Sequence, residues 1–408
     1  MLKNLKLKRR IIAALARMHF FGNPSAKMKI IGVTGTNGKT TTATLLYRVT
    51  KALGFKAGLI STVENIIDGK VVVAPVGRAV PGTTPDPINL HKLLNEMVEG
   101  GCEYVFMEVS SHALDQNRVA GINFAGGIFT NLTHDHLDYH KNFYNYFEAK
   151  KKFFKMLPAS AFALSNADDS YGLKMLEGIK ARKYTYGLKN QGNKADFNER
   201  INTRLLGEFN AYNVLAVSSV CFLLGFDMPR VNKILETIDP PKGRFEHFTS
   251  KNGVLVIVDY AHTPDALQNV LKTTKDIIPT KVGTPIKVGE KGKIISVFGC
   301  GGDRDPLKRS VMGKIGAELS DIAIFTSDNP RSENPDEIIS QMKKDLTTLL
   351  LKKIRTIANR HEAIIEAVKL AQKGDIILCA GKGHENYQEI KGVKHHFDDM
   401  EEFKKVYD

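Results

Sequence analysis

The stretch "VTGTNGKTTT" (residues 33–42) constrains the fold more than any other, because it directly follows the apolar run "MKIIG". An apolar strand, a glycine-containing loop and a helix that begins with Lys-Thr form the phosphate-binding loop of nucleotide-binding α/β proteins. The usual spacing, G-x-x-x-x-G-K-[ST], requires a first glycine where this chain has Val33. The stretch is therefore a shortened phosphate-binding loop or a turn with an incidental lysine. The strand–loop–helix context favours the loop.

The residues of this loop have the chemistry that a nucleotide requires. Gly35 and Gly38 allow close approach of the backbone, whose N–H groups at a helix N-terminus bind phosphate oxygens. Lys39 can reach the β- and γ-phosphates, and Thr40 can bind Mg²⁺. We expect ATP as the ligand.

Short apolar runs alternate with helix-period segments along the whole chain, which predicts an α/β protein with parallel sheets. Strands are predicted at 28–34, 56–62, 103–109, 126–132, 161–166, 253–260, 293–299, 321–327 and 375–381, and helices at 40–53, 264–276, 308–319, 336–350 and 360–372. The proline-containing "IDPPKGRFE" (238–246) is interpreted as a linker. We therefore predict a short basic helical segment (1–27), a central P-loop domain with a mostly parallel sheet (28–238) and a C-terminal Rossmann-like α/β domain (239–408).

Composition favours a protein that acts on small anions. The chain has 408 residues, 42% of them hydrophobic and 25% charged, with a formal net charge of +14. That charge suits nucleic acid, anionic membranes or polyanionic substrates, but the basic residues are spread out and form no Arg-rich tail. We expect small-molecule substrates, no nucleic acid and no membrane.

The cysteines and the apolar runs indicate a cytoplasmic protein. The four cysteines are far apart, in apolar contexts, and fit reduced core thiols: Cys102, Cys221, Cys300 and Cys379. The N-terminus resembles a signal peptide, but Arg17 interrupts its apolar stretch and no small-residue cleavage site follows. The longest apolar run, 214–226, is too short to span a bilayer.

Two further segments place ionisable side chains after predicted strands. Glu108 ends one strand in "MEVSSHALDQNR" (107–118), and Asp135 and His136 follow the next in "FTNLTHDHLDYH" (129–140). Ligands of open α/β sheets bind at these strand ends, so a carboxylate and an imidazole there could hold a second divalent ion. Each residue alone is more typical of a surface or a helix cap. The histidines could also suggest zinc, but their spacing is irregular and no cysteine accompanies them.

Nine segments occur in one order and together carry a resemblance: "GTNGKTT", "MEVSSH", "FTNLTHDHLDYH", "LLGEFNAYN", "GRFE", "DYAHTPDAL", "GCGGDRDPLKR", "DNPRSENP" and "AGKGHENYQ". From about residue 28 to the C-terminus the chain resembles the Mur ligases, and within them the members that add the third residue of the bacterial cell-wall peptide. The shortened loop is that family's version. The resemblance implies an ATP- and Mg²⁺-dependent ligase that forms an amide through an acyl phosphate.

The resemblance also implies roles for individual residues. Lys39, Glu108, His136 and Lys150 match catalytic positions; Thr40, Glu108, His136 and a carbamylated Lys150 match positions that hold Mg²⁺. ATP contacts match Gly35, Thr36, Asn37, Gly38, Lys39, Thr40, Thr41, Asn210, Arg244 and Asp259. Contacts to the UDP-muramoyl dipeptide match Thr83, Thr84, Ser110, Gln116 and Arg118. The pocket for the incoming amino acid matches Arg304, Asp328, Asn329, Pro330, Arg331, Gly381 and Glu385. Without the family, a solvated lysine is the simpler interpretation of Lys150, since Lys151 and Lys152 follow it.

The choice of amino acid depends on Arg331, whose planar fork can pair with a carboxylate. Meso-diaminopimelate has a second carboxylate that lysine lacks, so an Arg there favours diaminopimelate; the alternative is a Pro-terminated turn with a solvated Arg331. Family members usually carry a uridine-binding domain before the P-loop strand, whereas 27 residues precede Met28 here. The remaining domains, the basic N-terminal segment or an accessory polypeptide would then hold UDP. Two other functions stay open: a related ligase for another muropeptide or polyglutamate-like acceptor, and a non-catalytic ATP-binding scaffold.

Overall fold

The computed structural model of the chain describes residues 12, 22–72, 83–133, 135–189, 195–278 and 292–408. The chain forms two compact units, the first ending at Asp239 and the second beginning at Pro240. Most of the basic segment predicted over 1–27 lies outside the described residues; its described part contains the short 3₁₀ turn η2 (Pro24–Ala26).

The first unit contains a sheet of eight strands among its described residues, in the order β4-β3-β2-β5-β1-β6-β7-β8. Six of them run parallel, and the short strands β3 and β4 pair antiparallel at one edge. The strands are β1 (Lys29–Thr34), β2 (Ala57–Ile60), β3 (Asn65–Ile67), β4 (Lys70–Val72), β5 (Tyr104–Glu108), β6 (Phe124–Phe129), β7 (Phe162–Asn166) and β8 (Arg182–Tyr186). The strand β1 lies in the middle of this sheet, between β5 and β6.

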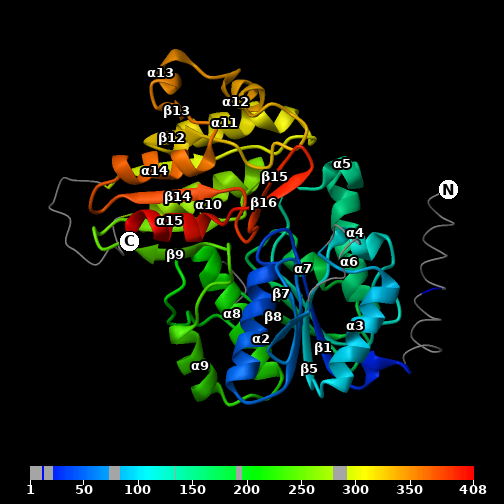
Figure 1. Ribbon diagram of the computed structural model, residues 1–408. Coiled ribbons are helices and arrows are strands. Elements are labelled where there is room, and N and C mark those ends of the chain that lie inside the picture. The colour runs from blue at the N-terminus through cyan, green and yellow to red at the C-terminus, as the bar shows by residue number, and fades with distance from the viewer. Residues whose placement is uncertain (1–11, 13–21, 73–82, 134, 190–194, 279–291) are drawn as a thin grey trace. The chain divides into compact units, whose positions relative to one another are not determined.

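Helices cover both faces of this sheet because neighbouring side chains of a buried strand point to opposite sides. In β1, Ile30 packs into a core with α3 and α6, whereas Ile31 packs into a second core with α2 and α8. Figure 1 shows α3 and α6 on one side of the sheet and α2 and α8 on the other. The helices of this unit are α2 (Lys39–Ala52), α3 (Pro87–Glu99), α4 (Ser111–Asp115), α5 (Leu137–His140), α6 (Phe143–Met156), α7 (Gly172–Met175), α8 (Glu208–Leu223) and α9 (Met228–Thr237).

The described residues of the second unit form a six-stranded sheet in the order β13-β12-β11-β14-β10-β9, in which the edge strand β9 runs antiparallel to β10 and the other pairs are parallel, and a separate hairpin of β15 and β16. The strands are β9 (Glu246–Thr249), β10 (Leu255–Asp259), β11 (Ile294–Phe298), β12 (Ile322–Phe325), β13 (Ile354–Thr356), β14 (Ile376–Ala380), β15 (Tyr387–Ile390) and β16 (Val393–His396). The helices are α10 (Pro264–Ile277), α11 (Leu307–Leu319), α12 (Pro335–Lys343), α13 (Thr348–Leu351), α14 (Arg360–Leu370) and α15 (Asp399–Tyr407).

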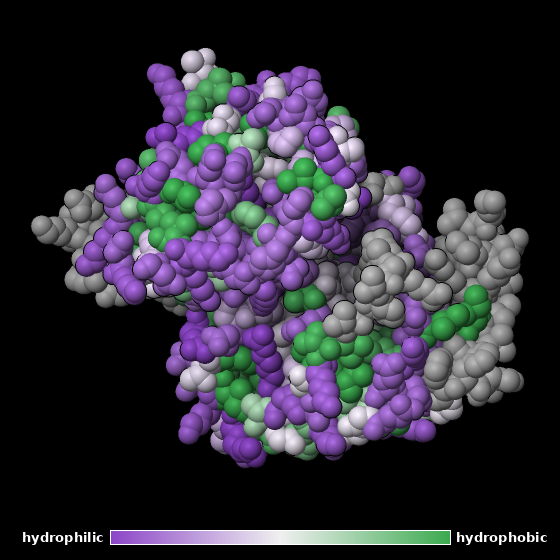
Figure 2. All heavy atoms as spheres, in the orientation of Figure 1, coloured by the Kyte–Doolittle hydropathy of each residue, from purple (hydrophilic) through white to green (hydrophobic). Residues whose placement is uncertain are grey.

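The α/β class and the nine predicted strands are confirmed, with small shifts at their ends. The predicted helix over 336–350 is wrong: α12 ends at Lys343, and α13 begins after Thr347, whose hydroxyl accepts a hydrogen bond from the Leu350 N–H as an N-cap. Among the described residues, no helix combines the length and apolarity needed to cross a membrane. Hydrophobic residues on the face in Figure 2 form small groups between hydrophilic ones.

Candidate active site

The phosphate-binding loop connects β1 to α2, which begins at Lys39. Gly35 and Gly38 have φ angles of 153° and 84°, in the region that favours glycine. A Cβ atom on Gly35 would lie 1.8 Å from Thr130 Oγ1, and one on Gly38 would lie 2.5 Å from Asn213 Oδ1. Both glycines are therefore required by their backbone angles and by close neighbours.

The segment that follows β6 holds the tip of the loop. The Asn37 N–H donates to Asn131 Oδ1 (2.9 Å), and the Asn37 carbonyl oxygen accepts from Thr130 Oγ1 (2.6 Å) and Asn131 Nδ2 (3.1 Å). The Thr36 N–H donates to the Asn131 carbonyl oxygen at 2.8 Å. Sequence reasoning missed Thr130 and Asn131. The predicted strand over 126–132 includes both residues, whereas β6 ends at Phe129 and leaves their side chains at the carboxyl end of the strand.

Two lysines from different helices lie at the loop. Lys39 Nζ donates to the carbonyl oxygens of Gly35 (2.9 Å) and Thr36 (2.7 Å). Lys150 Nζ, from α6, donates to the same Gly35 oxygen at 2.6 Å. The structure therefore brings Lys150 to the phosphate-binding loop, and the interpretation of Lys150 as a solvated surface residue is wrong, because its side chain is buried.

Burial changes the ionisation of Lys150. Its pKa is lowered well below the ordinary value, first by desolvation and then by the charge of Lys39, with Asp135 opposing. Its Nζ lies 4.5 Å from the centre of the Tyr146 ring, and the Tyr146 hydroxyl is 3.0 Å from Thr36 Oγ1. Tyr146, which sequence reasoning also missed, thus connects Lys150 to the loop.

Glu108 is buried at the end of β5, paired in register with Val33. Its Oε1 accepts from the Thr62 N–H (2.7 Å) and its Oε2 from Thr62 Oγ1 (3.1 Å). Thr62 Oγ1 also lies 3.1 Å from Thr83 Oγ1, whose hydroxyl can donate to it. The carboxylate is thus fixed beside the loop, and Thr62 joins it to a residue expected to contact the dipeptide substrate.

His136 has a left-handed backbone, with φ of 53°. Its N–H donates to Asp135 Oδ1 at 2.8 Å, and its ring lies 4.8 Å from the His112 ring, centre to centre. Desolvation lowers the pKa of His136 to about 4, aided by His112, Lys39 and Lys150 and opposed by Asp135. A neutral imidazole keeps a lone pair for a hydrogen bond or a metal ion.

The donor set suits Mg²⁺ better than zinc. No group of three or more His, Cys, Asp or Glu side chains that could hold a metal ion occurs among the described residues, although His134 lies outside them. Mg²⁺ instead uses one or two protein oxygens, with waters and substrate phosphates as its other ligands. Thr40 and Glu108 supply oxygens of that kind, so the residues present fit a phosphate-bound Mg²⁺.

The residues expected to contact the UDP-muramoyl dipeptide also meet near Glu108. Thr84 Oγ1 donates to the Glu108 carbonyl oxygen (2.9 Å) and accepts from the Ser110 N–H (3.1 Å). Arg118 donates from Nη1 to the Thr84 carbonyl oxygen (2.9 Å), and from Nε (3.0 Å) and Nη2 (2.9 Å) to Gln116 Oε1. The structure therefore brings together four of the five residues expected to contact the dipeptide: Thr84, Ser110, Gln116 and Arg118.

Asn210 is buried in α8, and both ends of its amide are used inside the protein. Its Nδ2 donates to the Leu206 carbonyl oxygen (2.8 Å), and its Oδ1 accepts from Asn213 Nδ2 (3.2 Å). Asn213 Oδ1 in turn accepts from Thr42 Oγ1 (3.4 Å) and lies against Gly38. Asn210 therefore supports the loop through Asn213.

In the second unit, Asp259 ends β10 and holds the backbone around it. Its Oδ2 accepts from the Phe245 N–H (2.7 Å) and its Oδ1 from the Ala261 N–H (2.9 Å). Burial raises the pKa of Asp259, and Arg244 opposes this. The Arg244 guanidinium lies 4.6 Å from the centre of the Tyr260 ring. The structure thus places Arg244 and Asp259 close together.

Asn329 is the centre of the predicted amino-acid pocket. Its Nδ2 donates to Glu385 Oε2 (2.8 Å), and its N–H donates to Asp328 Oδ1 (2.8 Å). Gly381 has φ of 116°, and a Cβ atom there would lie 2.6 Å from Asp328 Oδ2. Four of the predicted pocket residues therefore meet at the end of β14.

Arg331 is paired with protein groups, so it is not simply solvated. Its Nη1 donates to the Gly302 carbonyl oxygen (2.7 Å), and its Nε lies 3.4 Å from Glu389 Oε2. A Cβ atom on Gly301 would lie 3.1 Å from Arg331 Nη1 and 3.6 Å from Arg304 Cγ, so both arginines lie beside this glycine. Glu389, missed from the sequence, neutralises part of the Arg331 charge. Pro330 lies in the same turn, with its carbonyl oxygen 1.9 Å from where a Cβ on Gly302 would be.

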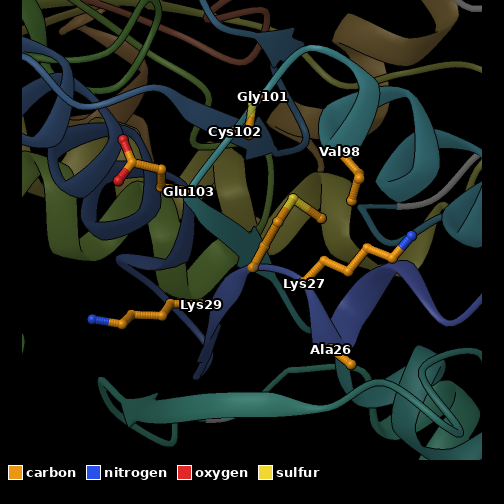
Figure 3. A pocket seen from close by; sticks show the side chains of 8 residues that line it. Ala26, Lys27, Lys29, Val98, Gly101, Cys102 and Glu103 are labelled. Atoms are coloured by element: carbon orange, nitrogen blue, oxygen red, sulfur yellow. The ribbon is translucent and has the colours of Figure 1, made fainter.

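A hollow of about 510 Å³ lies at the other end of β1, away from the phosphate-binding loop. Lys27, Lys29 and Glu103 line it together with backbone and apolar atoms (Figure 3). It contains no residue of the predicted site, and the side chains of Lys27 and Lys29 point in opposite directions in Figure 3. The candidate active site therefore lies at the carboxyl end of β1.

Known proteins resemble this chain in sequence over nearly its whole length. The Mur ligase middle domain matches residues 33–221, and the "Mur ligase, glutamate ligase domain" matches residues 243–383. A protein of Parabacteroides distasonis named UDP-N-acetylmuramoyl-L-alanyl-D-glutamate–2,6-diaminopimelate ligase is 50% identical over 402 residues, which cover 95% of this chain and 79% of that protein.

Solved structures resemble the chain as well. A structure of a UDP-N-acetylmuramoyl-L-alanyl-D-glutamate–2,6-diaminopimelate ligase, 33% identical, matches 93% of this chain and 78% of the other with a TM-score of 0.62. Mycobacterium tuberculosis folylpolyglutamate synthase, solved with ADP and AMPPCP, matches 91% of this chain and 92% of the other with a TM-score of 0.68. At 19% identity this second likeness shows the fold alone. Because both domain models match in order and a relative with half its residues identical aligns over most of both chains, this chain belongs to the Mur ligase family.

Proposed function

We propose that this chain is an ATP-dependent ligase that joins meso-diaminopimelate to UDP-N-acetylmuramoyl-L-alanyl-D-glutamate. The observation that carries the proposal is the meeting of Lys39 and Lys150 at one carbonyl oxygen of the phosphate-binding loop, beside Glu108 in the neighbouring strand. The relatives named for this reaction support the choice of substrates.

The proposed reaction has two steps. A carboxylate oxygen of the dipeptide attacks the γ-phosphorus of ATP, and the bond to the β–γ bridging oxygen breaks, so that ADP leaves. The amine of the incoming amino acid then attacks the acyl carbon, phosphate leaves with the bonding electrons, and the amine loses a proton. Both steps transfer negative charge, and such reactions depend on fixed positive groups placed before the reaction begins.

The protein supplies those groups at the loop. The backbone N–H groups at the start of α2 bind phosphate oxygens, and Lys39 offsets the charge of the β- and γ-phosphates. Thr40, Glu108 and His136 are the residues that would hold Mg²⁺. When bound, Mg²⁺ reduces the repulsion between a carboxylate and a triphosphate.

Lys150 contributes as a carbamate. Burial favours its neutral amine, which is the form that reacts with carbon dioxide. The amine nitrogen bonds to the carbon of CO₂ and loses a proton, so a neutral side chain becomes an anion. That anion, next to the loop, would support a second Mg²⁺.

The second unit selects the amino acid. Glu385 suits the distal ammonium group of diaminopimelate, and Arg331 together with Asn329 suits the distal carboxylate beside it. Glu389 already pairs with Arg331, so an incoming carboxylate shares or replaces that contact.

Formation of ADP tests the proposal. We expect ADP only when ATP, Mg²⁺, the UDP-muramoyl dipeptide and diaminopimelate are all present, and a large loss when any one is omitted. If ADP forms at the same rate without the dipeptide and without the amino acid, the proposal is contradicted. ATP binding without any turnover would favour the alternative function of a non-catalytic ATP-binding scaffold.

A further inference from the structure

The amino-acid pocket contains a buried lysine. Lys382 directly follows Gly381 after β14, and its side chain has 0% exposure. A buried ammonium group is costly unless several acceptors surround it. The acceptors around Lys382 therefore indicate what it does.

Lys382 Nζ contacts oxygen atoms from three residues. It donates to the Tyr387 carbonyl oxygen and to Asn329 Oδ1 (3.3 Å), and it lies 3.6 Å from Glu385 Oε2. Tyr387 begins β15, Asn329 follows β12, and Glu385 lies in the loop after β14. One ammonium group thus connects three separate segments of the second unit.

These contacts fix the orientation of the Asn329 amide. Its Oδ1 faces two groups that can only donate, the Lys382 ammonium and the Glu389 N–H (2.9 Å). The other end, Nδ2, must then face Glu385, to which it donates at 2.8 Å. If Lys382 were absent, a single backbone donor would hold the amide oxygen.

We propose that Lys382 is a positioning residue for amino-acid recognition: its ammonium group sets the orientation of the Asn329 amide and directs the Glu385 carboxylate toward the incoming amino acid. This inference rests on the proposed function, because it assigns Asn329 and Glu385 to the amino-acid pocket. It adds a residue that does not itself contact the substrate.

The proposed role of Lys382 predicts a change in the pH dependence of kcat/KM for diaminopimelate, which a purely structural role does not predict. Burial and the charge of Asp328 raise the pKa of Glu385, whereas Lys382 and Asn329 oppose this rise; Tyr260 also lies within electrostatic range. Without Lys382, the pKa of Glu385 rises further. Glu385 must be ionised to bind an ammonium group. In the variant it therefore becomes protonated at a higher pH than in the wild type as the solution is acidified. The acid limb of the pH profile of kcat/KM for diaminopimelate then moves to higher pH.

The first test compares three variants of the full chain. For Lys382→Met we expect the KM for diaminopimelate to rise about tenfold or more while the KM for ATP stays within about twofold. Lys382→Arg keeps the charge and should recover part of the loss. Lys394→Met is the matched control, since both Lys382 Nζ (5.6 Å) and Lys394 Nζ (3.9 Å) lie over the centre of the Tyr387 ring, but Lys394 has an exposed side chain. Equal KM values for diaminopimelate in wild type and Lys382→Met would overturn the inference.

The second test does not require turnover. The ¹³Cδ resonance of Glu385, assigned by its loss in Glu385→Gln, is titrated in wild type, Lys382→Met and Lys382→Arg. A midpoint that moves to higher pH in Lys382→Met, with Lys382→Arg close to wild type, supports the inference. An unchanged midpoint overturns it, even if the enzyme does not use diaminopimelate. Failure of the wild type to add diaminopimelate contradicts the proposed function separately.

Discussion

Lys39 and Lys150 donate hydrogen bonds to the same carbonyl oxygen, that of Gly35, at 2.9 and 2.6 Å. Two full positive charges at one acceptor would repel each other strongly in a buried setting. The lowered pKa of Lys150 resolves this conflict, because burial and the charge of Lys39 both favour its neutral form. In the mechanism proposed above, the two lysines therefore have different tasks: Lys39 neutralises phosphate charge, and Lys150 becomes a carbamate.

Replacement of Lys39 by alanine should abolish ligation. The loop would lose the cation that offsets charge on the transferred phosphate, and losses of about 10²–10³-fold or more in kcat are typical for one such group. The measurement is the rate of ADP formation under saturating substrates. Lys51→Ala is the control, because Lys51 lies in the last turn of the same helix and pairs with Asp68. Near-normal turnover of Lys39→Ala would remove the loop lysine from the mechanism.

Lys150→Ala should be almost inactive, with partial recovery in acetate, because a free carboxylate can replace the carbamate. Wild-type activity should also fall in buffers depleted of carbon dioxide and return with bicarbonate. A ¹³C NMR spectrum with labelled bicarbonate should show a carbamate signal that is absent in Lys150→Ala. If the variant retains full activity, or labelled wild type gives no such signal, Lys150 is not carbamylated in the active enzyme.

Arg331→Ala should lose use of diaminopimelate far more than binding of ATP. An unpaired charged group in a partly desolvated pocket costs roughly 2–5 kcal/mol, which corresponds to about 30-fold or more in kcat/KM for diaminopimelate. The KM for ATP should stay within about twofold. Arg355→Ala serves as the control, since Arg355 makes an exposed ion pair with Glu366. Equal effects on both substrates would mean that Arg331 acts through folding of the turn.

The Arg309–Glu333 pair should make stability depend on pH. Two hydrogen bonds of 2.8 Å from Arg309 hold the carboxylate and, as the largest cause, lower the pKa of Glu333 to about 2. This stabilisation is complete above the ordinary pKa of 4.5 and is lost as the pH falls through about 2. Because Glu333 is partly exposed and screened by water, we expect about 1–2 kcal/mol.

The measurement for this pair is urea unfolding of wild type and Glu333→Gln between pH 7 and pH 2. The wild type should be more stable at neutral pH, and the difference should shrink below about pH 4.5. A difference that stays constant down to pH 2 would show that ionisation of Glu333 does not stabilise the fold.

The sequence predicted the central strands and the phosphate-binding loop well, for a physical reason. Strands such as β1 and β10 are buried on both faces and appear as continuous apolar runs, which turn residues delimit. The strands β3, β4 and β13, which lie at or next to a sheet edge, have three residues each and carry little such signal. Tertiary pairing with a neighbouring strand decides their structure, so sequence pattern alone misses them.

Some residues of the candidate site could likewise be predicted from the sequence, and others could not. Gly35, Gly38 and Lys39 could be predicted because their chemistry is local to one loop. Thr62, Tyr146 and Lys382 could not, since each acts on a residue far away in sequence: Thr62 on Glu108, Tyr146 on Thr36 and Lys382 on Asn329. Only the folded chain shows which distant side chains meet.

A product assay tests the central claim most directly. The enzyme is supplied with ATP, Mg²⁺, the UDP-muramoyl dipeptide and equal amounts of meso-diaminopimelate and lysine, and the products are identified by mass spectrometry. The proposed function predicts the diaminopimelate adduct, in excess over any lysine adduct by about 30-fold or more. A lysine adduct of comparable amount, or no adduct at all, would contradict it.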